Sequence, residues 1–404
     1  MVFPVRGVLE GLVSRVEGLG SSVKVSMRSV GRIWEAPICK GVGECHRGGC
    51  RGNLLRWAVD GAENYCDPMT RALTMKRANQ RPAWFLVLFA TMLISASSKT
   101  SMAADPFQPT SQDRFVPADA KLAAVWCEGS FTEGPVAAAD GAILFSDIGP
   151  GANRIMRYEP RTGETTEFRR PSGQSNGLFL DSRGRLVACE GANGGGRRIS
   201  ITEPDGTVRT LADRYQGNRF NSPNDLAIDA RDRVYFTDPR YVGDEPRELD
   251  FEGVFLVLPD GAVHLATDDV QKPNGILVSP DQQTVYLADN NSDPAGNHQL
   301  LAFDIADDGR LTGKRVLHDF GPNRRGIDGM TLDAEGNIYA TAGSGPRAGV
   351  YVFDRTGGPL AFIRTPGDPT NCVFGRGGER NTLYITAGGE DGKYCLYRIR
   401  LSGQ

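Results

Sequence analysis

Six polar residues recur at regular intervals along the second part of the chain, and their side chains carry the oxygen atoms that hard cations prefer. Each stands just before a short apolar segment. They are Glu133, Asn176, Asn224, Asn274, Asp328 and Asn371, separated by 43, 48, 50, 54 and 43 residues. Two carboxylates and four amides converging on one point would form an oxygen-rich site for a divalent cation.

This set of ligands favours Ca²⁺, which takes about six to eight oxygens in flexible geometry. Mg²⁺ or Mn²⁺ could also bind, whereas Zn²⁺ is less suited because the set contains neither His nor Cys. A second interpretation is turn chemistry, since Asn–Gly and Asp–Gly pairs are common in tight turns. For Asn176 and Asn371 both interpretations stay open. Glu133 is a poor turn residue, so its place in the repeat points to binding.

The repeat also predicts how these residues are brought together. Each unit reads as a short apolar strand, a turn and a second strand, followed by a second pair of strands around a Gly-containing turn. The first halves include EGPVAAADGAILFSD from Glu133, NDLAIDARDRVYFTD from Asn224 and DGMTLDAEGNIYAT from Asp328. We therefore predict an all-β fold over residues 105–404, a six-bladed β-propeller of four-stranded antiparallel blades whose first strands line a central channel.

The sixth unit supplies only three clear strands, so we expect the N-terminal segment KLAAVWC, residues 121–127, to complete it. Pairing the two ends of the chain closes the ring and covers an exposed edge. This pairing would bring Cys127 close to Cys395, and a disulfide between them is a hypothesis. Cys189 and Cys372 are the other cysteines after residue 104, and four cysteines allow three pairings.

Residues 75–104 have the pattern of a signal peptide. Met75 is followed by basic residues, by the apolar run AWFLVLFATMLI and by small residues that place cleavage near Ala103 or Ala104. We therefore expect export to the periplasm or the outside of the cell, with residues 1–74 an upstream extension without a structural role. After residue 104 the chain carries 32 basic and 42 acidic side chains, which disfavours binding to nucleic acid or membrane surfaces.

Four short segments in matching order resemble the senescence marker protein 30/gluconolactonase family, also called regucalcin-like. They are TEGPV around Glu133, RFNSPNDLAID at Arg219–Asp229, PNGILVSPD from Pro273 and IDGMTLD from Ile327. The resemblance implies that Glu133, Asn274 and Asp328 hold one divalent metal, with Asn224 beside it. Asn221 and Asp225 are neighbouring candidates for the Asn224 role, and Arg219 resembles an arginine that contacts substrate oxygens.

The function implied is hydrolysis of a small sugar lactone such as D-glucono-1,5-lactone to its aldonic acid. The cation would polarise the lactone carbonyl, and Asp328 would take a proton from the attacking water. Arg219, Asn224 and Asn176 would hold the sugar hydroxyls, with Asn221 and Asp225 as further candidates. His298 stands in a loop sequence that could reach the mouth of the channel, whereas His264 and His318 fall in outer-strand patterns.

Two other functions compete with this one. A related calcium propeller could hydrolyse another ester, such as a homoserine-type lactone or an organophosphate. A non-catalytic propeller could instead bind a protein or glycan and keep the cation for structural reasons, because the scaffold alone proves no chemistry. The sequence leaves the oligomeric state open.

Overall fold

The computed structural model describes residues 13–19, 22–29, 32–39, 107–149, 151–389 and 391–402. The described chain falls into two units, residues 1–96 and 97–404. In the first unit β1 (Val13–Leu19), β2 (Ser22–Ser29) and β3 (Arg32–Cys39) form an antiparallel sheet. That residues 1–74 are an upstream extension stays a prediction. The predicted signal peptide, residues 75–104, lies outside the described residues.

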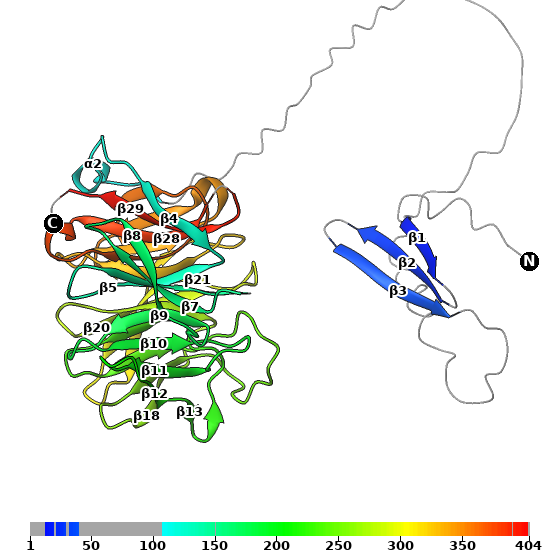
Figure 1. The fold of residues 1–404 in the computed structure, drawn as a ribbon, viewed down its shortest axis with the longest axis horizontal. Coiled ribbons are helices and arrows are strands. Elements are labelled where there is room, and N and C mark those ends of the chain that lie inside the picture. Colours follow the sequence, from blue (N-terminus) through cyan, green and yellow to red (C-terminus); the bar gives the residue numbers. More distant parts are fainter. Residues whose placement is uncertain are drawn as a thin grey trace, which may run out of the picture. The chain divides into compact units, whose positions relative to one another are not determined.

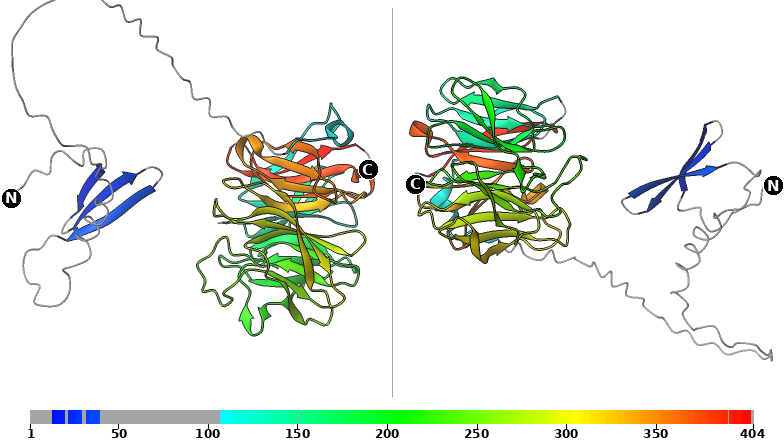
Figure 2. Two further views of the ribbon diagram at one scale, coloured as in Figure 1. Left: turned by 180° about the vertical axis from the view of Figure 1, so that it is seen from behind. Right: turned by 90° about the horizontal axis from the view of Figure 1, so that it is seen from below.

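The second unit is the predicted propeller, with six four-stranded antiparallel sheets (Figures 1 and 2). The first blade is β5 (Thr132–Ala137), β6 (Ile143–Asp147), β7 (Arg154–Glu159) and β8 (Glu164–Arg169). The second is β9 (Ser175–Leu180), β10 (Leu186–Glu190), β11 (Arg198–Thr202) and β12 (Val208–Ala212). The third is β15 (Leu226–Ile228), β16 (Val234–Thr237), β17 (Val254–Val257) and β18 (Val263–Thr267).

The fourth blade is β19 (Pro273–Val278), β20 (Thr284–Asn290), β21 (His298–Ile305) and β22 (Leu311–Asp319). The fifth is β23 (Ile327–Leu332), β24 (Ile338–Ala342), β25 (Gly349–Phe353) and β26 (Pro359–Arg364). The sixth is β27 (Pro369–Phe374), β28 (Thr382–Gly388), β29 (Tyr394–Arg400) and β4 (Ala123–Gly129). A two-stranded hairpin, β13 (Arg214–Tyr215) with β14 (Asn218–Arg219), precedes the third blade. None of the described helices is long and apolar enough to cross a membrane.

The core lies between neighbouring blades. One cluster joins Tyr339 and Val352 of the fifth blade to Leu383 and Ile385 of the sixth, and Phe115 of the short helix α2 (Gln112–Phe115) packs into it. Because each sheet buries apolar side chains on both faces, every blade is stabilised by two neighbours. Closing the circle therefore removes what would otherwise be two exposed apolar faces.

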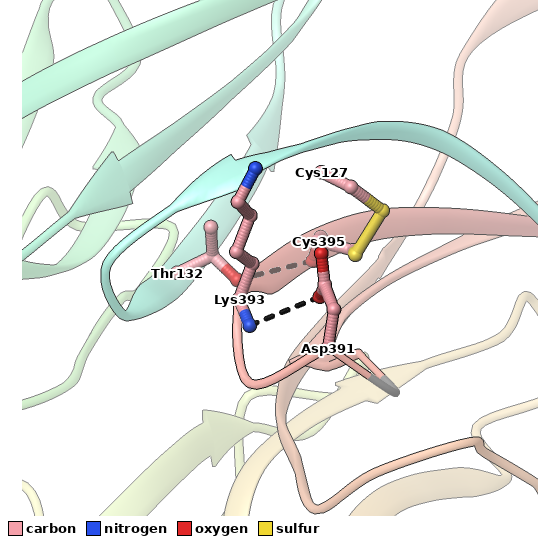
Figure 3. The surroundings of a disulfide bond; sticks show 5 residues. All are labelled: Cys127, Thr132, Asp391, Lys393 and Cys395. Atoms are coloured by element: carbon pink, nitrogen blue, oxygen red, sulfur yellow. Dashed lines mark hydrogen bonds between the residues drawn. A yellow bond between two sulfur atoms is a disulfide. The ribbon is translucent and has the colours of Figure 1, made fainter.

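The predicted ring closure is confirmed. β4 pairs antiparallel with β29, two residues further along the chain than the expected segment 121–127. In Figure 1 the cyan strand β4 lies at the edge of the sixth blade, beside the red strand β29. Cys127 and Cys395 form the hypothesised disulfide between these two strands, as Figure 3 shows. Cys189 and Cys372 are free thiols buried in the core.

Removing this disulfide is expected to loosen the closure of the ring. Cys127→Ser should lower the free energy of unfolding by about 2–4 kcal/mol, because the bond closes a loop of 268 residues in the unfolded chain. The melting temperature should fall by roughly 5–10 °C. A reducing agent should lower the melting temperature of the wild type by a similar amount and leave that of Cys127→Ser unchanged. Equal sensitivity of both proteins to the reductant would contradict a stabilising role.

Candidate functional site

A β-bulge interrupts the first strand of five blades at or beside the repeated polar residue. In β5 the pairing steps from Glu133 opposite Ser146 to Val136 opposite Leu144, which leaves one extra residue on β5. The same one-residue excess occurs at Asn176, Asn274, Asp328 and Asn371. A bulge bends its strand and changes the direction of a side chain. The irregularity is therefore a local cause that can turn these polar side chains out of the sheet face.

The glycines that follow the polar residues allow the inner strands of neighbouring blades to pack closely. A Cβ atom at Gly329 would lie 2.0 Å from the Asn371 side chain, and one at Gly275 would lie 2.5 Å from the Asp328 carbonyl oxygen. At Gly134, whose φ is +50°, a Cβ atom would lie 2.1 Å from the Asn176 carbonyl oxygen. These contacts link each inner strand to the next one around the ring. The Asn–Gly and Asp–Gly pairs therefore reflect crowding near the axis.

One cavity of about 760 Å³ is lined by five of the six repeated residues. These are Glu133, Asn176, Asn224, Asn274 and Asp328. They come from five consecutive blades, so residues almost 200 positions apart contribute to one wall. The structure therefore brings five of the six residues of the repeat into the wall of one cavity, while Asn371 lies outside its lining.

Three carboxyl groups of the described residues line this cavity, those of Glu133, Asp328 and Asp368, and the charge of Asp368 contributes to the raised pKa of Asp328. Glu133 is only 3% exposed, and its Oε2 accepts a hydrogen bond from the Gly134 N–H at 2.9 Å. Burial raises the pKa of Glu133 well above its usual value, and the nearby charge of Asp328 raises it further. Burial also raises the pKa of Asp328, against the opposing effect of Arg325, whose Nη2 donates to Asp328 Oδ2. The buried Glu133 carboxylate and the partly buried Asp328 carboxylate thus lie close enough to repel each other.

A hydrogen-bonded chain holds Asn274 beside them. Asn274 Nδ2 donates to the Tyr241 hydroxyl at 3.2 Å, and that hydroxyl donates to the Asn290 carbonyl oxygen at 2.8 Å. Lys272 Nζ lies 4.9 Å from the centre of the Tyr241 ring. A hydrogen bond from Asn274 also lowers the pKa of Asp328. With Nδ2 engaged as a donor, Asn274 keeps its Oδ1 as an acceptor.

Asp225 and Asn371 meet across the ring outside the lining of the cavity. Asn371 Nδ2 lies 3.5 Å from Asp225 Oδ2, and Asp225 Oδ1 accepts the Leu226 N–H at 2.9 Å. Burial is the largest effect on Asp225 and raises its pKa to about 7. The charge of Asp225 also contributes to the raised pKa of Glu133, so this carboxyl lies near the acidic pair.

Arg219 and Asn221 lie outside the cavity and are held by the protein itself. Arg219 Nη2 donates to the Gly196 carbonyl oxygen, and its backbone N–H donates to Glu248. Asn221 is fully buried, and its backbone N–H donates to Asp238 Oδ2 at 2.7 Å. Neither side chain lines the cavity in which a substrate would bind. Their substrate-binding roles therefore stay predictions.

Several lining residues escaped the repeat pattern. They are Tyr241, Asn290 and Arg325, while His298, whose loop sequence was expected to be able to reach the mouth of the channel, also lines the cavity. Tyr241 belongs to the long connection between β16 and β17, which has no counterpart in the other repeats. His298 is the first residue of β21 and is 3% exposed, with Nε2 2.8 Å from the Asn291 carbonyl oxygen. For Arg325 the sequence offered one signal, because this basic residue stands only three positions before Asp328.

No cluster of three or more His, Cys, Asp and Glu side chains suited to a metal occurs among the described residues. The predicted set has two such side chains, Glu133 and Asp328, and amide groups as its other members. An oxygen-rich site of this mixed kind matches the ligand preference of Ca²⁺ better than that of Zn²⁺.

Comparisons with known proteins agree on one family. The sequence profile of the SMP-30/Gluconolactonase/LRE-like region matches residues 131–389. A gluconolactonase of Zymomonas mobilis is 35% identical over 282 residues, covering 64% of this chain and 76% of that protein. The solved structure of a gluconolactonase from Xanthomonas campestris has a TM-score of 0.62 and 29% identity, covering 72% of this chain and 92% of that one. A calcium-binding regucalcin from Agrobacterium tumefaciens shares the fold, with a TM-score of 0.55, 20% identity, and coverage of 70% and 96%.

Proposed function

The chain belongs to the SMP-30/gluconolactonase/LRE-like family, and from this premise we propose that it is a lactonase that hydrolyses a sugar lactone such as D-glucono-1,5-lactone. One observation carries the proposal: Glu133, Asn224, Asn274 and Asp328 line a single cavity at the axis of the propeller. The cavity, at about 760 Å³, is large enough for a six-membered sugar ring.

We propose that Glu133, Asn274 and Asp328 hold one divalent cation, with Asn224 beside it. The residues fit such an ion, because the carboxyl groups of Glu133 and Asp328 and the amide of Asn274 line one cavity and offer oxygen ligands to it. Their oxygen-only chemistry favours Ca²⁺, with Mg²⁺, Mn²⁺ and Zn²⁺ as alternatives. When bound, the cation would act as a Lewis acid toward the lactone carbonyl.

The protein's own groups account for the proton transfers. Asp328 accepts a proton from a water molecule as that water adds to the carbonyl carbon. The ring C–O bond then breaks, and the departing oxygen takes the proton held by Asp328 to become a hydroxyl group of the aldonic acid, which returns Asp328 to its starting state. Asn176 and Asn224, which line the same cavity, would bind hydroxyl groups of the sugar. Tyr241 orients Asn274 through the hydrogen bond at 3.2 Å.

The proposal is tested by following acid release from D-glucono-1,5-lactone with the full chain, after subtraction of spontaneous hydrolysis. We expect a kcat/KM of about 10⁴ M⁻¹s⁻¹ or higher, as for ordinary enzymes. A homoserine-type lactone and an organophosphate, assayed in parallel, separate the lactonase from a propeller that acts on other esters. Binding of the sugar lactone without acid release would favour the non-catalytic alternative.

We also propose that the chain is exported. The Cys127–Cys395 disulfide supports this location, because such bonds persist in oxidising compartments. The hydrophobic segment before residue 104 supports it independently.

A further inference from the structure

Arg325 is a cationic side chain within an acidic site, and neither the repeat pattern nor the family motifs assigned it a role. It follows the fourth blade and comes two residues before β23, the strand that carries Asp328. Its side chain is 23% exposed and lines the same cavity as Glu133 and Asp328. Its Nη1 donates to the Gly343 carbonyl oxygen at 3.2 Å, which fixes the guanidinium against the fifth blade.

The two carboxylates differ in their counter-ions. Asp328, whose side chain is 13% exposed, forms an ion pair with Arg325. Glu133 forms no ion pair with any of the residues that the structure describes, and the Gly134 N–H is its hydrogen-bond donor. The charge of Arg325 nevertheless lowers the pKa of Glu133 as well as that of Asp328. One guanidinium therefore compensates in part both the buried Glu133 and the partly buried Asp328.

A divalent cation would occupy the same electrostatic position. It must approach Glu133 and Asp328 while a positive charge already faces Asp328, and like charges this close repel strongly in a partly buried site. Asp328 Oδ2, the oxygen that Arg325 engages, is also one of two oxygens through which Asp328 could bind an ion. Cation and guanidinium thus compete for the same carboxylate.

We propose that Arg325 is a built-in counter-ion of the metal-free site, which holds Asp328 in place and weakens the binding of the divalent cation. The inference rests on the cation of the proposed function and adds a residue that sets its affinity. In the metal-free protein, Arg325 stabilises the fold by compensating the buried acidic pair. In the loaded protein, the same charge opposes the ion. The observed affinity is therefore lower than the oxygen ligands alone would give.

Titration calorimetry of Ca²⁺ into the chelator-stripped full chain tests this. Arg325→Met keeps a long apolar stem but removes the charge, so it should bind Ca²⁺ about tenfold more tightly or better than the wild type. Arg325→Lys keeps the charge and should stay within about threefold of the wild type. Arg310→Met removes the same charge from an exposed turn, where Arg310 pairs with Asp308, and should leave the affinity unchanged.

Thermal melting gives a second readout that does not depend on activity. Without Ca²⁺, Arg325→Met should melt below the wild type, because it leaves Asp328 buried and unpaired. Saturating Ca²⁺ should narrow or abolish that difference, since a ligand that binds more tightly stabilises more.

Unchanged or weaker Ca²⁺ binding by Arg325→Met overturns the inference, as does a melting deficit that Ca²⁺ leaves intact. If the wild type binds no divalent cation, the proposed metal site fails and the inference fails with it. Lactone hydrolysis by the wild type is measured separately. It distinguishes failure of the proposed metal site from failure of the proposed lactonase activity.

Discussion

Asp328→Asn is expected to reduce lactone hydrolysis by roughly 10²–10⁴-fold, the range for loss of a positioned general base. The substitution keeps the size of the side chain and one carbonyl oxygen, but it removes the group that accepts the proton of the attacking water. It also removes one of the two carboxylates around the proposed cation. The quantity to measure is kcat/KM for D-glucono-1,5-lactone at saturating Ca²⁺, with the spontaneous rate subtracted.

The melting temperature distinguishes loss of the general base from misfolding of the Asp328→Asn variant. Asp328 is partly buried near Glu133, and its charge raises the pKa of that residue. Neutralising it relieves the repulsion with Glu133 but removes the ion pair with Arg325. Because these two effects oppose each other, Asp328→Asn should melt within a few degrees of the wild type in the presence of a chelator. Asp260→Asn, at an exposed turn where Asp260 accepts the Ala262 N–H, is the charge-matched control and should retain full activity. A folded Asp328→Asn variant with wild-type kcat/KM would falsify the assignment.

Removal of the divalent cation is the second change with a large expected effect. Treatment with a chelator should abolish enzyme-dependent hydrolysis, and added Ca²⁺ should restore it, because the proposed cation would supply the Lewis acid that polarises the lactone carbonyl. Ca²⁺ should also stabilise the folded protein, because it binds the folded site. At a hundredfold excess over the Kd, the free energy of unfolding should rise by about 2.7 kcal/mol, and the melting temperature should rise with it. Mg²⁺, Mn²⁺ and Zn²⁺ added in separate samples identify the preferred ion.

Glu133→Gln provides a matched variant for this experiment. It keeps the shape of a side chain that is 3% exposed but loses one charge of the ligand set. We expect it to need at least 10-fold more Ca²⁺ for half-maximal activity, because affinity depends on the number of charged ligands. Full activity of the wild type after exhaustive chelation, together with no thermal shift by any of the four ions, would rule out the metal-dependent mechanism.

Most of the architecture was predictable because the repeat is local and frequent. The spacing of Glu133, Asn176, Asn224, Asn274, Asp328 and Asn371 gives the number of blades, and the three strands of the last unit require a fourth from elsewhere. The closure also suggested the disulfide as a hypothesis, because pairing KLAAVWC with YCLYRIRL brings Cys127 near Cys395, although four cysteines allow three pairings. These inferences depend on the periodicity of strands and turns, which neighbouring residues largely determine.

The contents of the cavity were only partly predictable. Five of the six repeated residues line it, whereas Asn371 lies outside its lining and contacts Asp225. Arg219 could be aligned with a family motif, yet its guanidinium bonds to Gly196 within its own part of the ring. Sequence order reports which blade a residue belongs to, but the direction of its side chain depends on the contacts it makes after folding.

The sequence by itself determined the propeller, the closure of its ring and the two carboxylates that come near its axis. Only the tertiary structure decided that bulges accompany these residues, that glycines such as Gly329 are needed by neighbouring strands, and that Tyr241 and Arg325 join the site. The physical reason is that Tyr241 and Arg325 lie in loops. Their position depends on packing against other blades, and no periodic pattern in the chain records it.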